Sequence, residues 1–147
     1  MRAILTAVVL TLFVAPARAD MCGDLIARVE AGTDAKLVKR TVDFADLSAT
    51  GGMTMTLACG ELSAVGIQFR GKALPDAYFP LFGRAARVVT GADPVLIADA
   101  GQRARENAVR TRHSHVDAGG ALVTCSVISA AAGLVTACAA IEKDERR

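Results

Sequence analysis

The chain has 147 residues, of which 17 are basic, 15 acidic and 52% hydrophobic, and it contains four cysteines. This length is typical of one domain, and the near balance of charge excludes the strongly basic surface of nucleic-acid-binding proteins. Both surplus basic residues, Arg2 and Arg18, lie in the first nineteen residues, so the rest of the chain has a formal charge of zero.

Residues 1–19 have the pattern of a secretory signal peptide. An apolar run over 4–14 follows a positively charged start, and it is shorter than the roughly 20 residues that cross a bilayer. Ala17–Ala19 then reads A-R-A, which matches the small-residue pattern of a cleavage site. We therefore predict cleavage before Asp20. The product is a single exported domain over 20–147, periplasmic or extracellular, without a membrane span.

The first half of this domain is predicted to contain helices followed by a hairpin. Apolar residues recur at helical spacing over 22–31, and Gly32 is a typical helix stop. Residues 35–47 do not decide between helix and strand, and we favour a helix. Residues 53–59 and 64–70 alternate apolar with polar side chains, which predicts a hairpin with one buried face.

The second half is predicted to contain two helices and then strands. Residues 75–91 have helical period, and Asp93 followed by proline is a strong signal for the start of the next helix. From about Val109 the chain reads as strands separated by turns at 118–120 and 130–133. This order predicts an α+β fold, in which an antiparallel sheet of four to five strands packs against helices in a two-layer sandwich stapled by two disulfides.

An even number of cysteines after a secretory signal predicts disulfides in an oxidising compartment. If 130–133 is a loop between two strands, Cys125 lies opposite Cys138, at a distance that a disulfide can span. Cys22 would then pair with Cys59. The alternatives are that Cys125 and Cys138 are buried free thiols, or that one of them pairs with Cys59.

The segment HSHVD, residues 113–117, contains both histidines of the chain. If it is extended, His113, His115 and Asp117 share one face, and these side chains are competent ligands for Zn²⁺ or Cu²⁺. The other face of the segment is not apolar either, which is typical of an edge strand or a loop. We favour a solvent-exposed edge or loop, and a metal site is the alternative.

Four arginines precede this segment, so a cationic stretch is a candidate contact site for an acidic protein or an anionic envelope polymer. A solvated helix face and strand edge is the plainer interpretation. The candidate binding residues are Arg103, Arg105, Arg110, Arg112, His113 and His115.

No catalytic or cofactor motif occurs in the sequence. It has no G-x-S-x-G elbow and no phosphate-binding glycine loop, so we expect no cofactor. We therefore expect a small, exported, disulfide-bonded, non-catalytic interaction protein of the bacterial envelope, of the accessory, inhibitor or immunity type. Its partner would be another envelope or extracellular protein, or an anionic envelope polymer. The alternative is a metal-binding or small hydrolytic protein that uses His113, His115 and Asp117.

Overall fold

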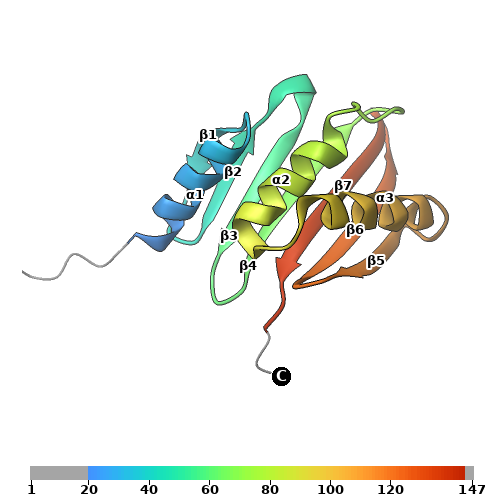
Figure 1. Cartoon of the computed structure of the whole chain (residues 1–147). Coiled ribbons are helices and arrows are strands. Elements are labelled where there is room, and N and C mark those ends of the chain that lie inside the picture. Colours follow the sequence, from blue (N-terminus) through green and yellow to red (C-terminus); the bar gives the residue numbers. More distant parts are fainter. Residues whose placement is uncertain (1–19, 145–147) are drawn as a thin grey trace, which may run out of the picture.

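The computed structural model describes residues 20–144, and the predicted signal peptide lies outside this part of the chain. The described residues form three α-helices and one seven-stranded antiparallel sheet with the strand order β1-β2-β3-β4-β7-β6-β5 (Figure 1). A short 3-10 turn, η1, precedes β3. The elements in chain order are α1 (Met21–Gly32), β1 (Lys36–Arg40), β2 (Phe44–Ser48), η1 (Thr50–Gly52), β3 (Thr54–Cys59), β4 (Ser63–Arg70), α2 (Tyr78–Thr90), α3 (Pro94–Thr111), β5 (His113–Ala118), β6 (Ala121–Ala130) and β7 (Gly133–Glu142).

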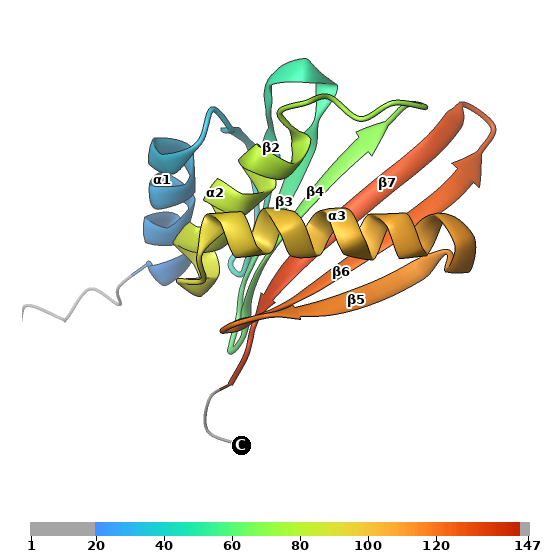
Figure 2. The same ribbon diagram turned by 45° about the vertical axis from the view of Figure 1, so that its right-hand side comes forward.

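All three helices lie on one face of the sheet (Figure 1, Figure 2). α1 contacts β1 and β3, α2 contacts β4 and β7, and α3 contacts mainly β5 and β6. None of the described elements covers the opposite face, which we call the uncovered face. Within residues 20–144, no helix has the length and apolar character needed to cross a bilayer.

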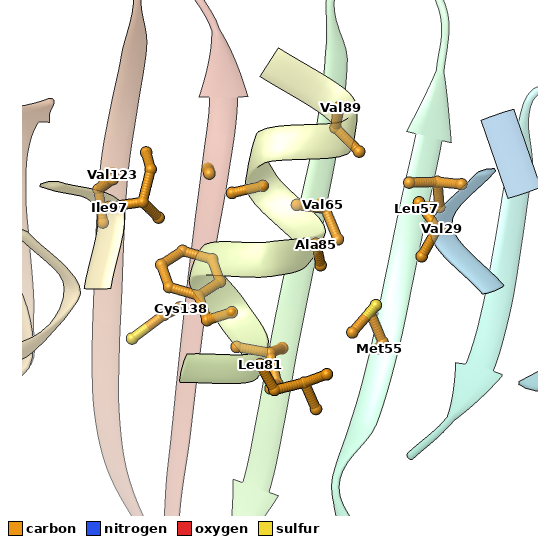
Figure 3. Packing of buried hydrophobic residues seen from close by; sticks show 14 of the residues in the cluster. Val29, Met55, Leu57, Val65, Leu81, Ala85, Val89, Ile97, Val123 and Cys138 are labelled. Atoms are coloured by element: carbon orange, nitrogen blue, oxygen red, sulfur yellow. The ribbon is translucent and has the colours of Figure 1, made fainter. Parts of the chain in front are cut away.

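The core lies between the helices and the sheet (Figure 3). In this view Leu81, Ala85 and Val89 of α2 lie over the strand that carries Val65, and Leu57 of the next strand lies beside Val29 of α1. These two strand residues are fully buried, and they belong to β3 and β4, which pair in antiparallel register. The predicted hairpin with one buried face is therefore confirmed.

The α+β class is confirmed, but the predicted number of four to five strands is wrong. Residues 35–47, for which we favoured a helix, contribute β1 and β2 to the sheet. In β2, Ala45 and Leu47 alternate into the core, whereas every residue of β1 is exposed. Because β1 buries no side chain, its sequence has no apolar periodicity, and its pairing with β2 decides its conformation.

The local signals around the two long helices act as expected. The side chain of Asp93 accepts hydrogen bonds from the backbone N–H groups of Val95 and Leu96 at 2.8 and 3.1 Å, and Pro94 begins α3. Gly91 ends α2 with a positive φ of 74°, a conformation that glycine adopts without steric cost. In the first turns of α3, Ile97 is buried, whereas the neighbouring Leu96 is 54% exposed.

One disulfide joins the sheet to a helix and a second lies within the sheet, and both are the pairings favoured from the sequence. Cys22–Cys59 links α1 to the end of β3, with 5.2 Å between the Cα atoms. Cys125–Cys138 joins β6 to β7, with 4.1 Å between the Cα atoms. These two strands pair with Cys125 directly opposite Cys138, as the predicted turn requires.

An ion pair and a helix cap meet at Asp20. Its carboxylate accepts a hydrogen bond from the backbone N–H of Gly23 at 3.0 Å and is held by both terminal nitrogens of Arg40 at 3.0 and 2.9 Å. Hydrogen bonding to Arg40, followed by the bond from Gly23, lowers the pKa of Asp20 from its ordinary value. The start of α1 is thereby tied to the edge strand β1.

We expect Asp20→Asn to reduce the acid sensitivity of the fold. Because the pKa of Asp20 is lower in the folded state, the pair stabilises the fold above the unfolded pKa, and this contribution is lost as the pH falls through the folded pKa. The difference in free energy of unfolding between wild type and variant should therefore shrink between about pH 6 and pH 2. Urea unfolding at each pH measures it, with Asp24→Asn in the same helical turn as control. A difference that stays constant with pH would exclude this role.

Candidate functional site

The HSHVD segment forms the edge strand β5. His113, His115 and Asp117 are exposed along one face of the strand, and Ser114 is half-buried on the other. Ser114 lies opposite Cys125, whose Sγ is 3.4 Å from the backbone oxygen of a glycine in α3, Gly101. The face of Ser114 is therefore the helix-covered one, and the two histidines and Asp117 project from the uncovered face.

A shallow hollow of about 410 Å³ lies on the uncovered face beside the histidines. Thr124 lies directly opposite His115, and Ser126 directly opposite His113. The imidazoles and hydroxyls can donate and accept hydrogen bonds, and neighbouring alanines add apolar surface. The lining residues are His113, Ser114, His115, Thr124, Cys125, Ser126, Ala137, Cys138 and Ala139. Such a hollow suits a small polar group such as a carboxylate.

Asp117 is engaged by a lysine rather than by the histidines. Its Oδ1 lies 2.6 Å from Nζ of Lys143, and hydrogen bonding to this ammonium group is the main reason why the pKa of Asp117 is below its ordinary value. In residues 20–144, no group of three or more His, Cys, Asp or Glu side chains is arranged to hold a metal ion. The arrangement therefore gives no geometric support to the metal interpretation of His113, His115 and Asp117.

The structure divides the predicted cationic stretch between the two faces of the sheet. Arg103 and Arg105 belong to α3, on the helix-covered face, and Arg105 is half-buried with an Nε that has no hydrogen-bond partner. Arg110 and Arg112 are exposed where α3 passes into β5. Arg112 has a positive φ of 68°, and its carbonyl accepts a hydrogen bond from the N–H of Val127 at 3.0 Å. Only this end of the stretch lies next to the histidines.

Sequence reasoning missed the hydroxyl residues of the hollow, although the signal was present. A two-residue turn at Gly119–Gly120 places Ala118 opposite Ala121, and counting outward from that pair places His113 opposite Ser126. The register of the third strand, β7, then adds the alanines of the floor.

A second hollow, of about 1190 Å³, lies at the other end of β5 and includes both Asp117 and Lys143. These two residues bind each other, so the charged groups of this hollow are partly satisfied within the protein. The first hollow is therefore the better candidate site. Comparison of the chain with models of protein families, with curated proteins and with solved structures gives no match.

Proposed function

We propose that this protein is exported and acts by binding, without catalysis, through the hollow beside His113 and His115. Its partner would be an acidic segment of another envelope or extracellular protein. The helices and the sheet would form a two-layer scaffold that leaves one sheet face free for contact. The observation that carries this proposal is that two exposed imidazoles, each opposite a hydroxyl group, line a hollow on the uncovered face. The two disulfides support an oxidising compartment.

The chemistry of the hollow favours carboxylate binding over catalysis. Imidazole N–H and hydroxyl groups donate hydrogen bonds to carboxylate oxygens, and these bonds strengthen when the imidazole is charged. A hydroxyl nucleophile needs a histidine that is itself oriented by a third group. The only acid that shares the face of the histidines in β5 is Asp117, and Lys143 binds it at 2.6 Å.

We expect binding of a glutamate-rich peptide to be tighter at about pH 5.5 than at pH 7.5, because histidine gains charge over this interval. The neighbouring Asp117, whose pKa is lowered by hydrogen bonding to Lys143, stays charged there. The double variant His113→Gln with His115→Gln should lose about tenfold in affinity at the lower pH, which corresponds to one charge-assisted hydrogen bond. Isothermal titration calorimetry measures both effects.

The matched control is Thr54→Ala, on the same face but in β3, away from the hollow. It should bind as the wild type does. Affinity that does not change with pH, or that persists in the double histidine variant, would contradict the proposal. Stoichiometric binding of Zn²⁺ that is lost in His113→Ala would also contradict it.

A further inference from the structure

The two edges of the sheet differ in how they are protected. At β1, Oε1 of Glu30 accepts a hydrogen bond from the backbone N–H of Leu37 at 2.8 Å, and the register shifts between Leu37 and Lys39. Side-chain caps, irregular pairing and lysines are the devices by which proteins prevent edge-to-edge contact. β5 pairs with β6 through six consecutive residues without a break and contains neither lysine nor proline. Among residues 20–144, β5 is therefore the less protected edge, with one outward carbonyl, that of His113, capped by the hydroxyl of Thr111.

The register shows which backbone groups of β5 point outward. The carbonyl of Arg112 accepts a hydrogen bond from the N–H of Val127 in β6. Residue pairs in an antiparallel ladder alternate between those that exchange hydrogen bonds and those that do not. The N–H and C=O groups of His113, His115 and Asp117 therefore point away from β6. In agreement, the hydroxyl of Thr111 reaches the carbonyl of His113 at 2.8 Å. The same three residues carry the side chains on the uncovered face.

We propose that two copies of this chain pair through β5, antiparallel, about a two-fold axis centred on His115. In this register His115 faces its own copy, and His113 of each chain lies opposite Asp117 of the other. Side chains of opposite charge that face each other across two paired strands stabilise the pairing, and side chains of like charge destabilise it. An axis centred on Asp117 would place two carboxylates opposite each other, and an axis centred on His113 would leave Asp117 without a histidine opposite it. An axis at Ser114 or Val116 would pair the outward backbone groups of only two of the three residues, whereas the axis at His115 pairs those of all three.

Pairing in this register closes the assembly. The interface is isologous, so each β5 is used once and no further copy is added there. The two seven-stranded sheets become continuous, and their remaining edges are the protected β1 strands. The hollows of both copies then lie on one uncovered face, on either side of the axis, next to His113 and His115 of each copy. An acidic partner with two binding segments could reach both hollows.

Sedimentation velocity tests the pairing directly. Because a single pair of strands buries a small interface, the wild type should shift from monomer to dimer between about 1 and 300 μM. His115→Pro removes an outward N–H, and proline is tolerated at such edge positions. This variant should keep the stability of the monomer and remain monomeric. A wild type that is monomeric throughout, or a folded His115→Pro that still dimerises, would overturn the proposal.

A charge exchange tests the register without relying on proline. At neutral pH, His113→Asp alone and Asp117→Lys alone should each weaken the dimer about tenfold. The first places two carboxylates opposite each other at both cross-strand pairs, and the second removes the carboxylate opposite each His113. The double variant should recover most of the wild-type affinity. Asp117→Lys and the double variant both lose the ion pair with Lys143. This loss therefore cannot explain why the double variant recovers dimer affinity relative to Asp117→Lys alone. Equal weakening in all three variants would overturn the register.

Cross-linking gives an independent measure of the same register. The Cα atoms of a residue and its copy at the axis lie about 5.5 Å apart, a separation that a disulfide can span. His115→Cys should therefore form a covalent dimer on mild oxidation. His113→Cys is the matched control and should not, because it faces Asp117 of the second copy. Cross-linking of His113→Cys as readily as His115→Cys would contradict an axis at His115.

Discussion

Replacing Cys22 and Cys59 by alanine is expected to lower the free energy of unfolding by about 4 kcal/mol, from the entropy of closing a loop over a sequence separation of 37 residues. This disulfide ties α1 to the end of β3. Cys22 is 4% exposed, so its sulfur also fills part of the core beside the helix. Urea unfolding of the wild type and of the double variant measures the difference.

The second disulfide provides the comparison. Replacing Cys125 and Cys138 by alanine removes a disulfide that spans a sequence separation of 13 residues. This should lower the free energy of unfolding by about 3 kcal/mol. These cysteines also lie on adjacent, hydrogen-bonded strands, which hold the two segments together without the covalent bond. An equal or larger effect at Cys125 and Cys138 would show that loop closure does not decide which disulfide contributes more to the free energy of unfolding.

The elements predicted correctly are those with local signals. Asp93 with Pro94 specifies a helix start through one side chain and one ring, and Gly91 specifies a helix end through its positive φ. The hairpin of β3 and β4 was predictable because its side chains alternate between core and solvent. β1 has no such signal, since all its residues are exposed, and only its pairing with β2 keeps it extended.

In the candidate site, too, features with a local sequence signal were predictable and features that depend on packing were not. The edge position of residues 113–117 was predictable because neither face of the segment is apolar. The pairing of Asp117 with Lys143 was not, since the two residues meet only after β6 and β7 have assembled. Nor could the sequence show which face α3 covers, and this decides that Arg103 lies apart from His113. Charged residues that are close in sequence lie close on the surface only when their helices and strands present them on the same face of the fold.

Substituting Gly83 by alanine is expected to lower the free energy of unfolding by about 3 kcal/mol, the upper part of the range for overpacking a core. A Cβ atom at this position of α2 would lie 2.3 Å from the backbone oxygen of Pro94 and 3.1 Å from its carbonyl carbon. Backbone atoms cannot rotate away as a side chain does, so α2 and α3 must separate. The start of α3 is fixed by Asp93, which caps it, and this limits how far the helix can move.

The control for this substitution is Gly60→Ala, in the turn between β3 and β4. A Cβ atom there meets no heavy atom within 4 Å, so the variant should unfold within about 1 kcal/mol of the wild type, since alanine also reduces the freedom of the unfolded chain. Urea unfolding of both variants measures the contrast. If Gly83→Ala is as stable as Gly60→Ala, the beginning of α3 yields to the added methyl group. In that case the close approach of α2 and α3 does not limit the packing of the helices on the sheet.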